Sequence, residues 1–172
     1  GLGDVYKRQV WSMFGTFNAD HVEQIHAAGA EAWTTVTTPT EAIAAARGGV
    51  DVLCVQGPAA GGHRGTWDIT VTPDSRQLEE LVSDVHAAVP ELPLIAAGGM
   101  RTAADVANAM SWSGVAACSC GSAFLLAAEA GTSDYNRQLL RRGGKTVSTR
   151  AFSGRFAPVS YTHLTLPTNR EV

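Results

Sequence analysis

A histidine in a glycine-rich loop is the clearest candidate for chemistry in this sequence. His63 lies in residues 56–65, QGPAAGGHRG, which follow the apolar run of residues 52–55. Glycines let the backbone turn sharply and approach a ligand closely. A histidine titrates near neutral pH, so it can accept or donate a proton there. We therefore expect His63 to act as an acid or a base; the alternative interpretation is a solvated histidine in a flexible surface loop.

Two further glycine turns directly follow apolar runs. Residues 96–100 read AAGGM and lead to Thr102, which can cap a helix, and residues 119–122 read SCGS before another helical stretch at residues 123–130. Backbone N–H groups exposed before a helix can bind an anion. Either turn alone is weak support, because it can simply be a tight connection. Two such turns on successive late strands are typical of phosphate binding in barrels, so the pair predicts a phosphorylated cofactor.

The pattern of apolar residues predicts that His63 and the two glycine turns are carried by a parallel sheet. Five runs of strand length alternate with helical patterns; the runs are residues 10–14, 32–36, 52–55, 94–97 and 115–120. Asn18 can cap one helix, and Thr38 with Glu41 predicts a capping box on the next. Alternation of this kind indicates an α/β fold with a sheet buried on both faces. A whole (β/α)8 barrel takes about 250 residues, so the 172-residue chain is either an open doubly wound domain or part of a barrel.

Composition excludes several classes of protein. Hydrophobic residues make up 45% and charged residues 17%, which is globular, and the net charge of −3 argues against nucleic-acid or membrane-surface partners. No apolar run reaches the ~18 residues of a membrane span. Cys54, Cys118 and Cys120 lie in apolar segments, so we expect reduced thiols in a cytoplasmic protein. No histidine or cysteine has zinc-site spacing, so we expect no metal.

The two ends of the chain do not fit the strand and helix pattern. Residues 1–9 and 159–172, including His163, carry no capping residues and break the alternation. We interpret both as translated sequencing-adapter read-through and expect the natural protein to extend beyond them. Residues 10–158 are then the part of the chain that belongs to the fold.

Four motifs give the chain a resemblance to a known family. QGPAAGGHRG, LIAAGGM and CGSAFL, followed by AFSGR, make residues 10–158 similar to the nitronate monooxygenase (2-nitropropane dioxygenase) family. The resemblance implies a flavin-dependent TIM barrel, of which this chain supplies strands four to eight. It implies an enzyme that uses FMN and molecular oxygen to oxidise an alkyl nitronate or nitroalkane to a carbonyl compound and nitrite. The flavin carries the redox chemistry, and we expect the chain to be inactive alone.

The resemblance also implies roles for single residues. His63 matches the catalytic position, as a base or a hydrogen-bond donor toward the substrate. The matching cofactor positions are Gln56, Gly61, Gly62, Gly98, Gly99, Ser119, Cys120, Gly121 and Ser122. Two alternatives stay open: a flavin-type enoyl-acyl carrier protein reductase, which would also bind NAD(P)H, and a non-catalytic flavin-binding half-barrel. The sequence does not predict the oligomeric state.

Overall fold

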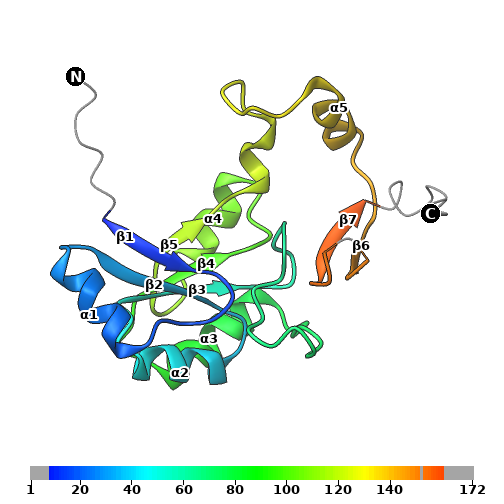
Figure 1. The fold of residues 1–172 in the computed structure, drawn as a ribbon. Helices are drawn as coiled ribbons and strands as arrows, with labels where there is room; N and C mark the ends of the chain where they lie inside the picture. The colour runs from blue at the N-terminus through cyan, green and yellow to red at the C-terminus, as the bar shows by residue number, and fades with distance from the viewer. Residues whose placement is uncertain (1–7, 152, 161–172) are drawn as a thin grey trace. The chain divides into compact units, whose positions relative to one another are not determined.

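The computed structural model describes residues 8–151 and 153–160 (Figure 1). The chain divides into two compact units. Within the described residues, the first, here called the sheet unit, comprises residues 8–60 and 64–120. The second, the C-terminal unit, comprises residues 61–63 together with the described part of the chain from residue 121 onward.

The sheet unit is built on five parallel strands. They are β1 (Gln9–Ser12), β2 (Glu31–Val36), β3 (Val52–Gln56), β4 (Leu94–Ala97) and β5 (Val115–Ser119). Each strand pairs in parallel with the next one along the chain, so the order is β1-β2-β3-β4-β5. All five predicted runs are strands, which confirms the α/β fold; the first ends at Ser12 rather than at residue 14.

Four helices cover one face of this sheet. They are α1 (Ala19–Ala27), α2 (Pro39–Arg47), α3 (Leu78–Ala88) and α4 (Ala103–Ala109). The main apolar core joins helix residues such as Val22 and Leu81 to alternate strand residues such as Leu53 and Val55. Figure 1 shows α2 and α3 together on this side.

The opposite face of the sheet carries a smaller cluster of Cys54, Ile95 and Ala97, against which Trp33 packs. Every member of this cluster comes from a strand. The strand order never reverses, so the sheet lacks the switch point of a doubly wound fold. The open doubly wound alternative is therefore wrong. Same-handed crossovers along an unreversed order place the four helices on one side. The side chains of Cys54, Ile95 and Ala97 on the other face are buried as well, as predicted for a sheet buried on both faces.

Side chains at the helix starts explain where the helices begin. The Asn18 carboxamide accepts the N–H of His21 at 2.8 Å, and the Thr38 hydroxyl accepts the N–H of Glu41 at 3.2 Å. The predicted capping box at Thr38 is only half formed. The Glu41 carboxylate binds the N–H of Thr37 at 2.6 Å and its hydroxyl at 2.8 Å instead of returning to Thr38. A complete capping box starts α4, between Thr102 and Asp105.

The C-terminal unit contains a short 3-10 helix η1 (Ser122–Leu126), helix α5 (Asp134–Arg142), and an antiparallel pair of strands, β6 (Thr146–Thr149) and β7 (Ala157–Ser160). The helical stretch expected over residues 123–130 is this 3-10 helix, and it ends at Leu126. Helix α5 carries Arg141 and Arg142 in its last turn and is capped by Gly143.

The interpreted adapter segments fall mostly outside the described residues. Residues 1–7 and 161–172, with His163, belong to that part. Within the described part, β1 begins at Gln9 and β7 includes residues 159 and 160.

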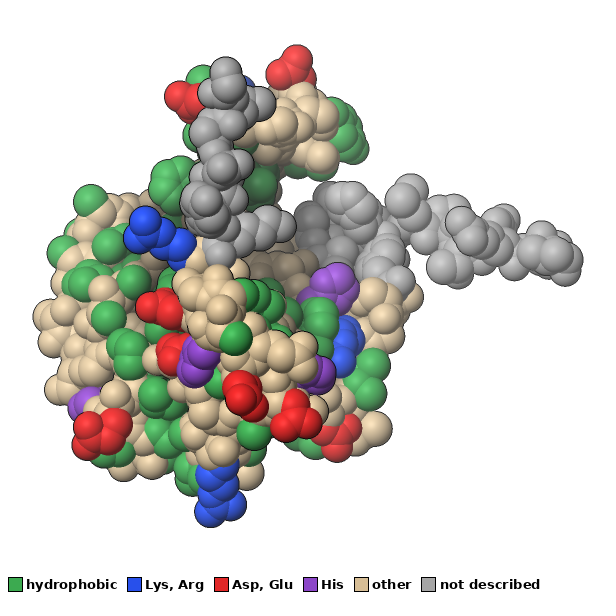
Figure 2. All heavy atoms as spheres, turned by 60° about the vertical axis from the view of Figure 1, so that its left-hand side comes forward, with side chains coloured by type: hydrophobic (Ala, Val, Ile, Leu, Met, Phe, Trp, Pro, Cys, Tyr) green, Lys and Arg blue, Asp and Glu red, His purple; other side chains and the backbone are tan. Residues whose placement is uncertain are grey.

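The surface of the described residues carries charges of both signs. On the face drawn in Figure 2, acidic side chains lie among hydrophobic and polar ones, and Lys and Arg side chains are scattered rather than gathered into a patch. No helix of the described part is long and apolar enough to cross a membrane.

Candidate functional site

The long connection after β3, residues 57–76, is tied to the carboxyl ends of its neighbouring strands. The Gly57 N–H donates to the Ala97 carbonyl at the end of β4, at 2.9 Å. The Gln56 side-chain oxygen accepts the N–H of Gly65 at 2.7 Å. Gly65 also lies against Thr35 of β2, where an added Cβ would be 2.8 Å from the Thr35 methyl group. This glycine therefore permits a close approach that a larger residue would block.

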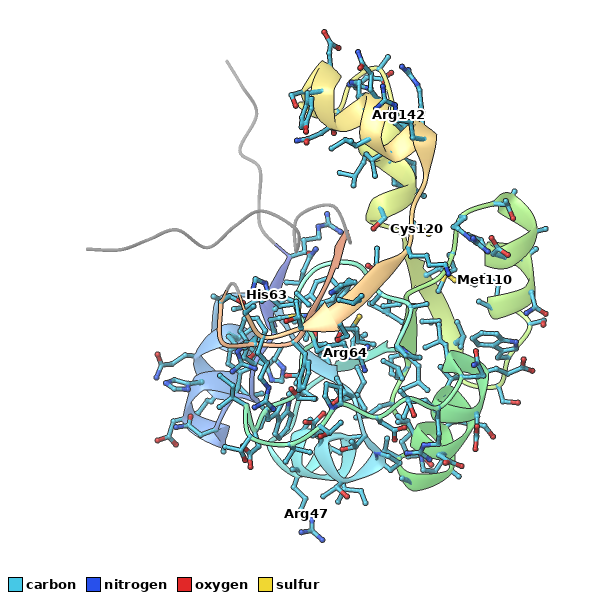
Figure 3. All side chains as sticks on the ribbon, turned by 90° about the vertical axis from the view of Figure 1, so that its right-hand side faces the viewer. Arg47, His63, Arg64, Met110, Cys120 and Arg142 are labelled. Atoms are coloured by element: carbon cyan, nitrogen blue, oxygen red, sulfur yellow. The ribbon has the colours of Figure 1, made fainter. Side chains whose placement is uncertain are left out.

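A buried arginine closes the first part of this connection. Arg64 is only 4% exposed, and its Nη1 donates to the Gly57 carbonyl (Figure 3). Its Nη2 points to the carbonyls of Gln56 at 3.4 Å and Asp74 at 3.5 Å. Burial lowers the pKa of Arg64, and the carboxylates of Asp74 and Glu41 oppose that shift. The guanidinium thus remains cationic while it links residue 64 back to the start of the loop.

A second tether joins the connection to β2. The Trp67 indole N–H donates to the Thr35 carbonyl at 3.0 Å, and the Trp67 backbone N–H donates to the Glu41 carboxylate at 2.9 Å. The same carboxylate binds Thr37. The carboxyl end of β2 therefore holds the connection directly through the Thr35 carbonyl, and the residue after the strand, Thr37, helps to fix the Glu41 carboxylate that accepts the Trp67 N–H.

The glycine pair after β4 fits closely against the loop after β3. Gly98 has φ +113° and Gly99 has φ +79°. A Cβ on Gly98 would lie 2.8 Å from the Ala60 backbone nitrogen, and one on Gly99 would lie 3.2 Å from the Ala59 Cβ. Both glycines therefore have a structural reason to be present, whether or not they also contact a ligand.

Some backbone N–H groups of the turn after β4 already have an acceptor, and others are available to bind an anion. The N–H groups of Arg101 and Thr102 donate to the Asp105 carboxylate at 2.9 and 2.8 Å. These hydrogen bonds, the Arg101 N–H first, hold the pKa of Asp105 below its usual range. The start of α4 is thus occupied by its own carboxylate. Within the described part of the chain, the N–H groups of Gly99 and Met100 have no acceptor, so they are the donors that suit a phosphate group.

In the C-terminal unit, His63 contacts AFSGR, the last of the four sequence motifs. The exposed His63 side chain places its Nε2 2.7 Å from the hydroxyl oxygen of Ser153, which belongs to AFSGR. The Ser153 hydroxyl also points to the Arg155 carbonyl at 3.4 Å. In the same unit, a Cβ on Gly61 would meet the Ser122 hydroxyl oxygen. Residues 61–63 therefore lie against Ser122 and Ser153 within this unit.

The remaining predicted residues have looser surroundings. Gly62 has φ +75°, and added Cβ atoms at Gly62 and Gly121 would find no heavy atom within 4 Å. Ser119 is paired with Ala97 at the end of β5, and half-buried Cys120, labelled in Figure 3, packs against the main core. Among the described residues, no group of three His, Cys, Asp or Glu side chains is arranged to hold a metal ion.

Comparison with known proteins assigns a family to this arrangement. The family model for "Nitronate monooxygenase" matches residues 4–169. The chain belongs to the nitronate monooxygenase family. It is 35% identical over 146 residues to the nitronate monooxygenase of Paraburkholderia phytofirmans and 33% identical to that of Pseudomonas aeruginosa. These matches take in 84% of this chain but 39% and 41% of the relatives. The chain thus spans about two fifths of the length of these curated relatives.

Solved structures give the same picture for this nitronate monooxygenase family member. It matches the nitroalkane oxidase from Streptomyces ansochromogenes with a TM-score of 0.79 and 32% identity, over 90% of this chain and 45% of that one. It matches FabK from Thermotoga maritima with a TM-score of 0.71 over 88% of this chain and 46% of that one. That second match has 24% identity and shows a shared fold alone.

The sequence does not predict two residues that make the contacts described above, Arg64 and Ser153. Arg64 stands out only as a charge inside a glycine-rich loop, and its burial depends on carbonyl groups that the fold brings back to it. Ser153 is one of many serines, and its contact with His63 joins positions 90 residues apart. Only the presence of AFSGR among the family motifs gave a signal for Ser153.

Proposed function

We propose that the full-length protein containing this chain is an FMN-dependent enzyme that oxidises alkyl nitronates with molecular oxygen to a carbonyl compound and nitrite. The observation that carries this proposal is the hydrogen bond between His63 and Ser153. It joins QGPAAGGHRG to AFSGR, two of the motifs on which the family resemblance rests. Membership of the nitronate monooxygenase family and the names of the relatives support the same activity.

His63 is the proposed catalytic residue. An imidazole can take a proton from a substrate carbon or donate a hydrogen bond to a nitro or nitronate oxygen near neutral pH. If Nε2 donates to Ser153, the basic lone pair of the neutral ring lies on Nδ1. Ser153 then fixes the tautomer and the orientation of the ring, as a partner of a catalytic histidine commonly does.

The proposed cofactor residues follow from the geometry of each turn. The N–H groups of Gly99 and Met100 suit the FMN phosphate, and Gly98 permits the turn that presents them. When bound, the flavin supplies the oxidation–reduction chemistry. We retain the other proposed flavin contacts from the sequence; they are Gln56, Gly61, Gly62, Ser119, Cys120, Gly121 and Ser122.

For the whole molecule, we propose that β1 to β5 are strands four to eight of a (β/α)8 barrel. The unreversed strand order and the single helix-covered face support this assignment, because a barrel has all its helices outside. The free cysteines, of which Cys54 is buried, are consistent with the proposed cytoplasmic location.

Anaerobic reduction of the bound flavin tests the proposal directly. Propyl nitronate mixed with the full-length protein without oxygen should bleach the oxidised flavin absorbance, whereas NADPH should not. Bleaching by NADPH and not by the nitronate would instead support the enoyl reductase alternative. A flavin that neither compound reduces would support the non-catalytic alternative.

A further inference from the structure

We propose that Arg64 is a positioning residue that holds residues 56–65, here called the His63 loop, in a closed conformation. The inference rests on the proposed catalytic role of His63, because it assigns to the neighbouring residue the task of fixing the backbone from which His63 projects. Arg64 belongs to the sheet unit, and all its hydrogen bonds described above are made within that unit.

The contacts of Arg64 close the loop at its base. The guanidinium donates to the carbonyls of Gly57 and Gln56, where the loop begins, although Arg64 itself is near the end of the loop. The next residue makes a parallel link, since the Gly65 N–H donates to the Gln56 side chain at 2.7 Å. Residues 64 and 65 are thus hydrogen-bonded to residues 56 and 57, and we call this set of contacts the latch. Only residues 58–63 lie between its two ends.

The chemistry of the latch requires an arginine. A planar guanidinium can donate to several carbonyls in different directions, whereas a lysine ammonium is a single compact donor group. Burying a cation is unfavourable unless its donors are satisfied. The two terminal nitrogens of Arg64 donate to backbone carbonyls rather than to a carboxylate, and its buried Nε has no hydrogen-bond partner among the described residues. A loop that needed only stability would be served by apolar packing. The buried guanidinium of Arg64 therefore indicates that the closed conformation of the loop is itself required.

The loop composition explains why a latch is needed. Residues 56–65 contain four glycines, which lose more backbone freedom on ordering than other residues do. A catalytic acid or base must stay within hydrogen-bond reach of its substrate, and a displacement of about 1 Å can cost about 10²-fold in rate. An unlatched loop would leave His63 present but poorly placed.

The test compares Arg64→Lys with Arg47→Lys in the full-length protein. Arg47 is an exposed arginine at the end of α2 and serves as the matched control (Figure 3). Arg64→Lys should lower kcat for propyl nitronate about 10-fold to 100-fold, with KM and flavin content within about threefold of wild type. Amide hydrogen exchange over residues 57–65 should become at least about tenfold faster. Arg47→Lys should change neither kcat nor amide exchange over residues 57–65.

Several results would overturn the inference. If Arg64→Lys keeps both kcat and loop exchange within about twofold of wild type, Arg64 does not position the loop. A fall in flavin content equal to the fall in kcat would make Arg64 a cofactor-binding or packing residue.

Failure of the proposed function gives a different pattern. A wild-type protein that oxidises no nitronate contradicts the proposed function, and the exchange comparison then decides whether the latch exists. If Arg64→Lys does not fold, exchange in the wild-type protein decides. The N–H group of Gly65, which donates to the Gln56 side chain, should exchange at least about tenfold more slowly than that of exposed Gly62. Equal exchange rates at these two positions would overturn the latch.

Discussion

His63 and Arg64 are adjacent in sequence and have opposite surroundings. The His63 side chain is exposed and hydrogen-bonded to Ser153, whereas Arg64 is 4% exposed and bound to carbonyls at the start of its own loop. A reacting group has to reach a small molecule, while the residue that fixes it has to be immobile. The pair therefore divides the proposed work between a residue that contacts the substrate and one that orders the backbone.

We expect His63→Ala to lower turnover by about 10²-fold to 10⁴-fold while the flavin content of the full-length protein falls much less. A positioned acid or base contributes a factor of this size, and the flavin is held mainly through its phosphate in our proposal. Steady-state kinetics and the flavin-to-protein absorbance ratio measure the two effects. Ser153→Ala should cause a smaller loss of turnover, because it removes only the partner of the ring. Equal losses of flavin and activity in His63→Ala would make His63 a cofactor-packing residue.

Cys54 gives a prediction for the pH dependence of stability. Burial in the smaller core cluster raises the pKa of its thiol from 9.0 to about 12, with a hydrogen bond from Thr35 opposing part of the shift. In the unfolded chain the thiol ionises near pH 9. The unfolded state is therefore favoured as the pH rises from 9 toward 12, by up to about 1.4 kcal/mol per pH unit.

The measurement is the free energy of unfolding at pH 8 and pH 10, in urea with a reductant, for wild type and Cys54→Ala. Between these two pH values the wild type should lose about 1 kcal/mol more than the variant, which lacks the ionising thiol. The two proteins share every other titrating group, so the difference isolates Cys54. Parallel pH profiles would show that the Cys54 thiol is not buried in the folded protein.

At the scale of elements, the turn after β4 shows how a glycine pair can serve packing and binding together. Gly98 has a positive φ and lies against the Ala60 backbone. Gly98→Ala should therefore destabilise the protein by about 2 kcal/mol or more, because it combines backbone strain with a steric clash. Gly29→Ala is the matched control, since Gly29 has φ +72° but no heavy atom within 4 Å of an added Cβ.

The free energies of unfolding of both variants in urea separate the cost of backbone strain from the cost of the steric clash with Ala60. Gly29→Ala should cost about 1 kcal/mol from backbone strain alone. If Gly98→Ala costs no more than Gly29→Ala, the loops after β3 and β4 are not packed together as described.

The elements also show what a sequence can reveal and what it cannot. Strands and helix caps depend on local pattern, so the five runs and the caps at Asn18 and Thr102 were predicted correctly. Glu41 was wrong as the second half of a capping box, because Trp67, distant in sequence, and Thr37 compete for its carboxylate. Strands β6 and β7 were not predicted, since each is defined by its pairing with the other in a two-stranded sheet. The His63–Ser153 contact likewise depends on chain folding rather than on local pattern.

At the scale of the whole molecule, β1 and β5 are the edge strands of the sheet. Among the described residues each of them pairs with one strand, and Val10 and Trp11 of β1 are 42% and 40% exposed. Edge strands with apolar side chains offer unpaired backbone groups to other chains. Since the chain spans about two fifths of its relatives, these are the edges at which a barrel would continue in our proposal.

We therefore expect the 172-residue chain alone to associate and to retain FMN poorly. The turn at Gly99 can still offer N–H groups to a phosphate, but the flavin ring would lack the part of its pocket supplied by the missing strands. Light scattering coupled to gel filtration, after addition of FMN, measures mass and flavin retention together. A monodisperse monomer that keeps stoichiometric FMN would contradict the proposed partial barrel.

The central claim is that these residues belong to an enzyme that oxidises nitronates by means of a flavin and oxygen. Its most direct test is nitrite release by the full-length protein, purified with its flavin and given propyl nitronate in air without NAD(P)H. We expect nitrite to accumulate as oxygen is consumed, and His63→Ala to release it at least about 10²-fold more slowly. A flavin-loaded wild-type protein that consumes no oxygen and releases no nitrite under these conditions would contradict the account.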